Sequence, residues 1–283
     1  MKRIASIIFA TTFLMTAFYI SSCKKKKEEA TPSDGLTSET NEAQSQWDDA
    51  LKISEDAINV NGQSSRTESY PTITLVPGSG TTGTITIDYG TDGLTASNDG
   101  KFRKGKLVIT YSDKYRNTNA VITTSTNNYY VNGKHIKGRR TVTNNGSYSY
   151  SVVDSDSLGT AGSYAQIIYA NGEGTTTWKS TRTRTWTAGY GTNSIGNLAD
   201  DVYSISGTAS GVSKEGKVYS MNITNLIVKL DCYLTYYTFM PSGGTIDIVT
   251  TEGTRSVNYG NGISCDRNVI FTAIDGKTYE LSL

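Results

Sequence analysis

Residues 175–186 have the sequence TTTWKSTRTRTW, in which threonine occupies almost every second position. This alternation of residue types decides the fold class. Successive side chains of a β-strand point to opposite faces of a sheet. One face of this segment would carry mainly threonines, and the other would carry Trp178, Arg182, Arg184 and Trp186. Neither face is a simple apolar layer. The pattern therefore predicts a strand in a broad sheet that is partly wet on both sides, with guanidinium groups stacked on indole rings.

Two interpretations of this strand stay open. The tryptophans and arginines could form a ligand surface, to which Tyr129 and Tyr130 of a neighbouring predicted strand would add aromatic side chains. Alternatively, the side chains could form cross-strand ladders that only stabilise an exposed sheet.

The same period of two recurs on both sides of this segment, which predicts many strands. Asn-Gly and Asp-Gly pairs between them accept the positive φ angles of tight turns, so most neighbours should be antiparallel. We expect an all-β fold with a large antiparallel meander, either a sandwich or a curved half-barrel sheet. The other predicted strands are residues 72–76, 84–89, 106–111, 120–131, 135–143, 148–153, 165–169, 202–209, 217–224, 226–233, 245–249, 255–259, 268–272 and 277–281.

One short amphipathic helix precedes the strands. Ser45 to Asp48 resembles a capping box, and Asn61-Gly62 would end the helix. At about 14 residues the helix is marginal unless it docks on the sheet. Its apolar stripe, in which Trp47 is the expected core anchor, consists of Trp47, Ala50, Leu51, Ala57 and Ile58.

The first 22 residues read as a signal peptide. A short cationic start is followed by a mainly apolar run, which ends in small residues directly before Cys23. This pattern resembles the signals of bacterial lipoproteins, in which the equivalent Cys is lipidated and becomes the first residue of the mature protein. The alternative is an incidental thiol behind an ordinary cleavage site. The lipid reading implies a membrane anchor made of several acyl chains.

The segment after Cys23 suggests a location. Lys24 to Lys27 could lie on anionic head groups, or, with Glu28 and Glu29, could resemble the surface-export signal of Bacteroidota lipoproteins. We expect an outer-membrane lipoprotein that faces outward. Residues 23–44 would form a lipidated flexible tether, and residues 45–283 the helix and the β domain.

Several motifs together resemble a group of uncharacterised all-β lipoproteins of Bacteroidota. They are the Cys23 signal, the short helix, the loops at Tyr89-Gly90 and Tyr259-Gly260, the run from Asn128 to Val131, the strand from Ser180 to Trp186, and Leu230-Asp231-Cys232. The resemblance covers most of the mature chain. It brings no catalytic or binding residues that can be transferred.

Two cysteines follow Cys23, namely Cys232 and Cys265. In an exported chain such a pair most often forms a disulfide, and both lie at the ends of predicted strands. Two buried free thiols are the alternative. We expect no metal site here, because no His is nearby.

Composition excludes some partners. Without the signal and the charged run after Cys23, the chain has 21 Lys and Arg against 24 Asp and Glu. This part of the chain therefore lacks the excess of Lys and Arg that is typical of nucleic-acid-binding proteins.

The search for catalytic chemistry is mostly negative. The single histidine, His135, lies between lysines and has no evident nucleophile to serve. Carboxylate pairs remain, as in sugar hydrolases, but acidic residues beside Ser, Gly and Asn are more often turn residues. The candidate carboxylates are Asp99, Asp154, Asp156, Asp200 and Asp201.

We therefore expect a non-enzymatic surface binding or envelope-assembly protein without a cofactor, which binds a protein or glycan partner through exposed aromatics. A periplasm-facing lipid or lipoprotein carrier is an alternative, with acyl chains held between the sheet and the Trp47 helix. A glycan hydrolase that uses carboxylates is a weaker one.

Overall fold

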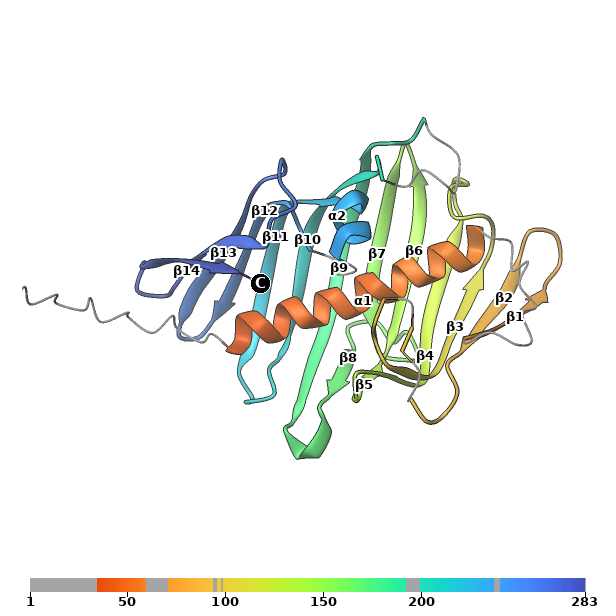
Figure 1. The fold of residues 1–283 in the computed structure, drawn as a ribbon, viewed down its shortest axis with the longest axis horizontal. Helices are drawn as coiled ribbons and strands as arrows, with labels where there is room; N and C mark the ends of the chain where they lie inside the picture. Colours follow the sequence, from red (N-terminus) through yellow and green to blue (C-terminus); the bar gives the residue numbers. More distant parts are fainter. Residues whose placement is uncertain are drawn as a thin grey trace, which may run out of the picture. The chain divides into compact units, whose positions relative to one another are not determined.

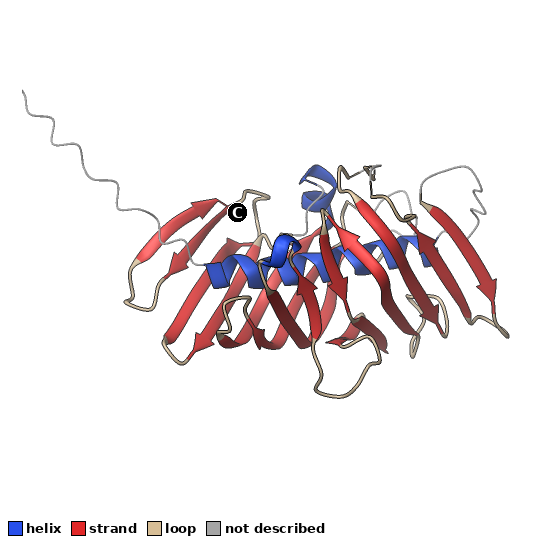
Figure 2. Cartoon of the chain, turned by 90° about the horizontal axis from the view of Figure 1, so that it is seen from below, coloured by secondary structure: helices blue, strands red, loops and turns tan. Residues whose placement is uncertain are grey.

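The computed structural model describes residues 35–59, 71–93, 96–97, 99–191, 199–236 and 240–282. In these residues the chain forms one antiparallel sheet of 15 strands and a long helix, α1 (Gly35–Asn59), which runs across one face of the sheet (Figures 1 and 2). The predicted signal peptide, Cys23 and the charged run after it lie outside this part. None of the described helices is both long and apolar enough to cross a membrane.

The expected all-β antiparallel class is confirmed. Most strands pair with their neighbours in sequence, from β1 at one edge to β15 at the other, in a single sheet, so the sandwich alternative is wrong. The strands are β1 (Thr72–Pro77), β2 (Gly83–Asp88), β3 (Arg103–Tyr111), β4 (Val121–Val131), β5 (Lys134–Lys137), β6 (Arg139–Gly146), β7 (Ser149–Ser155), β8 (Ala165–Ile168), β9 (Thr175–Ala188), β10 (Val202–Val212), β11 (Val218–Lys229), β12 (Gly243–Thr250), β13 (Gly253–Asn261), β14 (Asn268–Thr272) and β15 (Thr278–Ser282).

The sheet is split in its middle. Strand β4 pairs with β6 along one half and with β5 along the other, and β9 pairs with β7 and β8 in the same way. The single strand expected at residues 135–143 is therefore broken, and Gly138 lies at the break. Gly138 has a φ of +151°, and a Cβ there would lie 2.8 Å from Cζ2 of Trp47. Only glycine lets the buried indole ring approach the backbone this closely.

Helix α1 is much longer than expected. It spans 25 residues and begins at Gly35, so residues 35–44 are helical and not part of a flexible tether. The reason is tertiary: Leu36 and Ala43 are buried, and Glu39 accepts hydrogen bonds from the Thr176 hydroxyl (2.7 Å) and the Lys214 amide (2.9 Å). The predicted apolar stripe is confirmed, because all five of its side chains are buried: Trp47, Ala50, Leu51, Ala57 and Ile58.

A second correction concerns residues 217–233. Two strands were expected, but β11 continues through a bulge at Asn225 (φ 48°) to Lys229, and helix α2 (Leu230–Tyr236) follows it. Cys232, expected at a strand end, therefore lies in α2. The predicted disulfide with Cys265 is confirmed, with Cα atoms 5.2 Å apart, and it ties α2 to the segment between β13 and β14. A short 3₁₀ helix, η1 (Ala170–Gly172), precedes β9.

The core lies between α1 and one face of the sheet, which we call the inner face; the other is the outer face. In β9 the side chains from Thr176 to Trp186 that point inward are all buried, and those that point outward are half-buried or exposed. The predicted alternation is confirmed. The expectation that both faces are wet is wrong, because α1 covers the inner one.

Candidate functional site

Five of the six side chains expected to form a binding surface are buried. Tyr130 is half-buried and stacks on His135, with ring centroids 4.3 Å apart. The others cannot form an exposed surface, because they lie on the inner face in the interior of the protein: Tyr129, Trp178, Arg182, Arg184 and Trp186.

The arginines of the inner face pair with acidic residues of α1. Arg140 Nη1 lies 2.7 Å from Asp48 Oδ1, and Arg103 Nη2 lies 2.7 Å from Asp49 Oδ2. Arg184 pairs in the same way with Glu55. The side chains of all six residues are 12 % exposed or less. Helix and sheet are thus joined by buried charge pairs as well as by the apolar stripe.

Asp154 is the centre of this network. Burial alone would raise the pKa of this carboxyl, but Arg140 and Arg182 and the hydrogen bonds outweigh burial, so the pKa lies well below its usual value. The donors are Arg140 Nε (2.6 Å) and Nη2 (3.0 Å), Trp178 Nε1 (2.9 Å), Ser180 Oγ (2.5 Å) and Arg182 Nη2 (3.3 Å).

The other candidate carboxylates do not gather with Asp154. Asp99 pairs with Arg103 at 2.6 Å, and Asp156 accepts the Thr160 amide in an exposed turn. Asp200 is exposed, whereas Asp201 is buried, and burial raises the pKa of Asp201 to about 6. The structure therefore does not bring the candidate pairs into a shared catalytic arrangement.

Two small cavities lie on the inner face among the described residues. The two cavities found between α1 and the described part of the sheet have volumes of about 20 and 10 Å³. One water molecule needs about 10 to 15 Å³ measured in this way. An acyl chain does not fit in either of them.

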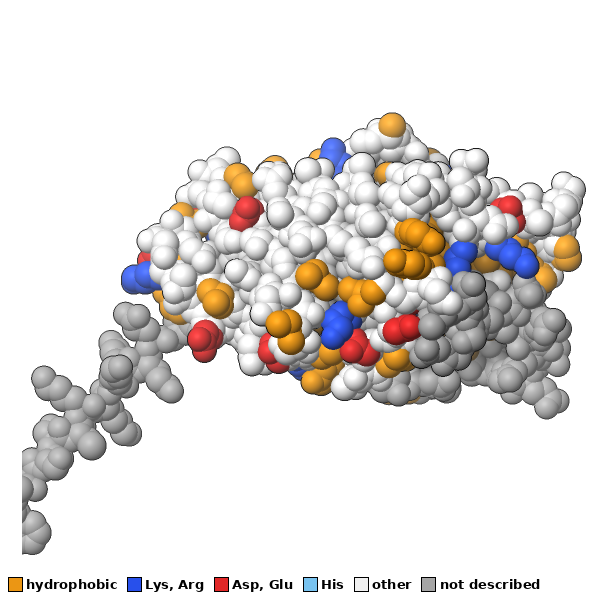
Figure 3. Space-filling model, turned by 90° about the horizontal axis from the view of Figure 1, so that it is seen from above, with side chains coloured by type: hydrophobic (Ala, Val, Ile, Leu, Met, Phe, Trp, Pro, Cys, Tyr) orange, Lys and Arg blue, Asp and Glu red, His pale blue; other side chains and the backbone are white. Residues whose placement is uncertain are grey.

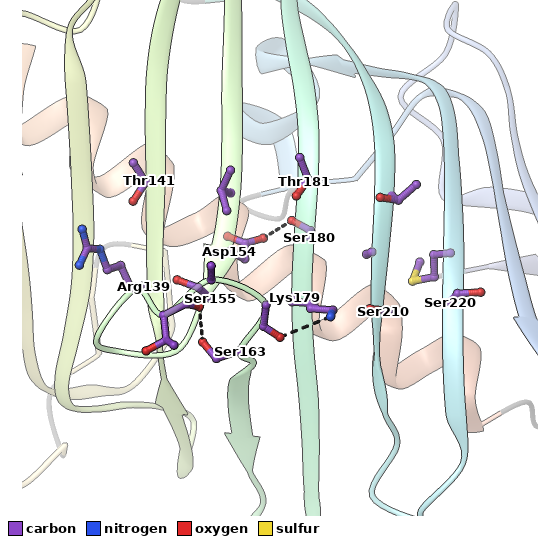
Figure 4. A pocket seen from close by; sticks show the side chains of 18 of the residues that line it. Arg139, Thr141, Asp154, Ser155, Ser163, Lys179, Ser180, Thr181, Ser210 and Ser220 are labelled. Atoms are coloured by element: carbon purple, nitrogen blue, oxygen red, sulfur yellow. Dashed lines mark hydrogen bonds between the residues drawn. The ribbon is translucent and has the colours of Figure 1, made fainter.

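The outer face carries a larger groove, of about 480 Å³, beside the loop of residues 156–164 (Figure 4). Its floor is made by outward side chains of β6, β7, β9, β10 and β11. Most of them carry hydroxyl or amide groups, together with two cations: Arg139, Thr141, Ser155, Lys179, Thr181, Thr208, Ser210, Ser220 and Asn222.

The charged groups that face the groove are positive. Asp154 is the single acidic residue among those that line it, and Arg140 and Ser180 hold its carboxylate on the inner side of the sheet. Arg139 Nη1 donates to the Leu158 carbonyl (3.1 Å), and Lys179 Nζ donates to the Gly162 carbonyl (3.4 Å), so both cations also hold the loop. The groove thus presents cations and hydroxyl groups.

A second group of polar and aromatic side chains lies at one end of the strands. We call Arg116, Tyr148, Trp186, Tyr190 and Asp201 the rim cluster; none but Trp186 and Asp201 was singled out from the sequence. The Tyr148 and Tyr190 rings stack at 4.4 Å and are 50 % and 46 % exposed. Seen from above, the surface is mostly uncharged, with small groups of hydrophobic side chains (Figure 3). Asn145-Gly146 indicated a turn here, but gave no sign that Ser147 and Tyr148 would occupy its tip.

Asp231 lies beside the disulfide, with its oxygen within 4.8 Å of both sulfur atoms. Both sulfurs are used in the bond, so this group has no thiolate for a metal.

No family model, curated protein or solved structure matches this chain.

Proposed function

We propose that the protein is a lipid-anchored, non-enzymatic binding module of the outer membrane, which holds a glycan in the groove on the outer face. The groove carries this proposal. Its volume, about 480 Å³, lies within the range of about 300 to 1,000 Å³ that is usual for ligand sites.

The lining favours a glycan over a protein partner. Side-chain hydroxyls both donate and accept hydrogen bonds, as sugar hydroxyls do. Protein interfaces depend on large aromatic and apolar anchors at their centre. The apolar residues that line the groove are Val153, Ala161, Ala209 and Met221, and the last two are buried. Lys179 and Arg139 would suit acidic substituents on the sugar.

The other two classes have less support. A lipid carrier needs an apolar chamber, and α1 fills the inner face where such a chamber was expected. A hydrolase needs two cooperating carboxyls, and Asp154 is ionised and bound to Arg140.

The test is binding of the full chain, purified in detergent, to a glycan array, followed by calorimetry with the glycans that bind. We expect Lys179→Gln to weaken binding about tenfold, because a hydrogen bond to a charged group is lost. Lys137→Gln, at the exposed lysine of β5, is the matched control. Thr181→Val should weaken binding roughly two- to tenfold, while Thr183→Val, on the same face of β9 and not part of the groove lining, should not. Binding that both groove variants leave unchanged would refute the groove as the site.

The anchor is tested separately. Radiolabelled palmitate should be incorporated into the wild type and not into Cys23→Ser. Protease treatment of intact cells then reports the orientation, and a replacement of residues 24–29 tests the export signal. Incorporation into Cys23→Ser would contradict the anchor at this residue.

A further inference from the structure

The rim cluster comes from three connections at the same end of the strands and from the end of β9. Arg116 lies between β3 and β4, Tyr148 in the turn from β6 to β7, and Tyr190 just after β9. Trp186 lies near the end of β9, and Asp201 directly before β10. The strand register brings these ends together, because β4 pairs with β6, β7 with β9, and β9 with β10 (Figure 1).

The aromatic rings form a continuous stack-and-edge arrangement. Trp186 meets Tyr148 and Tyr190 edge-on, with centroid distances of 6.1 and 6.2 Å. Trp186 also stacks on Tyr203, with ring centroids 5.9 Å apart. The guanidinium of Arg116 lies 4.2 Å from the centroid of the Trp186 ring. The two exposed tyrosines are thus supported by a buried indole and do not stand alone on the surface.

Two buried polar atoms in this cluster have no hydrogen-bond partner. They are Nε1 of Trp186, a donor, and Oδ1 of Asp201, an acceptor; the two side chains are only 4 % and 1 % exposed. Buried polar groups are normally bonded, and an exception needs an explanation. A ligand that both donates and accepts hydrogen bonds would supply one.

The charged groups around Asp201 limit the chemical class of ligand that the rim cluster could bind. Arg116 Nη2 lies 3.7 Å from Asp201 Oδ2, and the hydroxyl of Tyr203 lies 3.4 Å from the same oxygen. Asp200 and Glu55 add negative charge around Asp201. A cationic ligand would meet Arg116, and an anionic one would meet these carboxyl groups, so the surroundings favour an uncharged ligand.

The backbone at Tyr148 is unusual as well. Ser147 and Tyr148 have φ angles of 50° and 61°, which are rare for residues with a side chain, and rarest for bulky ones. The strain holds an aromatic ring at the tip of an exposed turn.

We propose that the rim cluster is a second ligand site, separate from the groove, which binds an uncharged saccharide ring. The C–H face of the sugar would lie on the exposed tyrosine rings. Both unpartnered atoms are buried, so contact with them would require the side chains around them to shift; one sugar hydroxyl would then accept from Trp186 Nε1, and another would donate to Asp201 Oδ1. Tyrosine and tryptophan suit this role because each combines a large apolar body with a polar group.

The test uses the full chain in detergent with methyl glycosides of glucose, galactose, mannose and N-acetylglucosamine at millimolar concentration. Saturation-transfer NMR and tryptophan fluorescence are the readouts. We expect at least one glycoside to bind, Tyr148→Ala to weaken its binding tenfold or more, and Asp201→Asn to weaken it at least fivefold. Tyr236→Ala, at another exposed tyrosine on α2, and Lys137→Gln, at an exposed lysine outside both the groove and the rim cluster, should bind as the wild type does.

Melting temperatures of Tyr148→Ala and Asp201→Asn show whether each variant is folded; the first residue is exposed, so folding should not depend on it. If none of the four glycosides binds, or if both folded rim variants bind as tightly as the wild type, the proposal is wrong. Loss of glycoside binding in Tyr236→Ala or Lys137→Gln would also overturn it, because the binding would then not depend on the rim cluster in particular. Glycan binding in the groove is judged independently by the Thr181 and Thr183 variants.

Discussion

Replacement of Asp154 by Asn should reduce the stability of the whole domain strongly. The group of Asp48, Arg140, Asp154 and Arg182 has two positive and two negative charges, and Asp154 and the two arginines are at most 1 % exposed at their side chains. Asp154→Asn keeps the shape of the side chain and leaves one positive charge without compensation in the interior. Removing one partner of a buried ion pair costs about 3 to 5 kcal/mol.

For a domain of this size, 1 kcal/mol corresponds to about 2 to 4 °C in melting temperature. We therefore expect Asp154→Asn to lower the melting temperature by roughly 6 to 20 °C. Urea unfolding followed by tryptophan fluorescence measures the same loss, because Trp47, Trp178 and Trp186 are all buried. Asp247→Asn, the same change on the outer face of β12, is the control and should change stability by less than about 0.5 kcal/mol.

A second replacement tests whether charge is the cause. Burial lowers the pKa of Arg182 despite Asp48 and Asp154, and Nε and Nη1 of Arg182 have no hydrogen-bond partner. Asp154→Asn combined with Arg182→Met restores neutrality, so the double variant should be more stable than Asp154→Asn alone. A loss below about 1 kcal/mol for Asp154→Asn, or a double variant at least as unstable as the sum of the single changes, would refute the argument.

Three further predictions concern other parts of the fold. Trp47→Ala should lower the free energy of unfolding in urea by about 3 to 5 kcal/mol, because the ring is fully buried. Gly138→Ala should also destabilise the protein strongly, because the new Cβ would lie 2.6 Å from the Cβ of Ala165 and 2.8 Å from the Trp47 indole. A wild-type urea midpoint for either variant would contradict the packing described. Reduction of the disulfide between Cys232 and Cys265, which are 33 residues apart, should cost about 3 to 4 kcal/mol, and Cys232→Ser with Cys265→Ser should make the protein insensitive to reductant. The pKa of Asp201 is raised to about 6, so the folded protein binds this proton more tightly than the unfolded chain does, and this group lowers stability as pH rises from about 4 to 6. Asp201→Asn should remove this part of the pH dependence and raise the melting temperature at pH 8 relative to wild type. A melting temperature that Asp201→Asn lowers equally at pH 5 and pH 8 would contradict this prediction.

The strand pattern could be predicted from the sequence because it depends on local alternation. In β9 the division of the side chains into two alternating sets was predicted correctly from residues 175–186 alone, and the turn at Asn132-Gly133 has the positive φ angles expected for such a pair. The disulfide was predicted because two cysteines follow the expected export signal, although Cys232 lies in α2 and not at the end of a strand.

What covers the inner face could not be predicted in the same way. Residues 35–44 are polar, and polarity is typical of a tether, yet Glu39 and Thr40 are buried in the docked helix. The partners of Glu39, which are Thr176 and Lys214, lie more than 100 residues away in sequence. A pattern within one segment carries no information about such contacts, so the arginines of β9 were taken for surface residues when they in fact pair with α1.

The candidate site was missed for a related reason. The groove is made by outward hydroxyl groups of five strands, and each of these strands alone reads as an ordinary wet surface. The rim cluster forms only where three connections and the end of β9 meet at one end of the sheet. Tyr148 and Tyr190 stand out only once the register between the strands is known.

The position of α1 at the beginning of the described chain has a consequence for synthesis. A ribosome completes this helix before it makes any strand that the helix will contact, and the tyrosine whose hydroxyl donates to Asn41, Tyr259, comes 218 residues later. The helix therefore lacks part of its dock for much of translation, although partners such as Arg103 and Arg140 are made earlier. Its acidic side chains, which later pair with arginines, keep the waiting segment soluble, whereas a purely apolar docking face would be exposed to premature association during the same interval. A docking face that carries charged as well as apolar side chains thus exposes less apolar surface before the native fold exists.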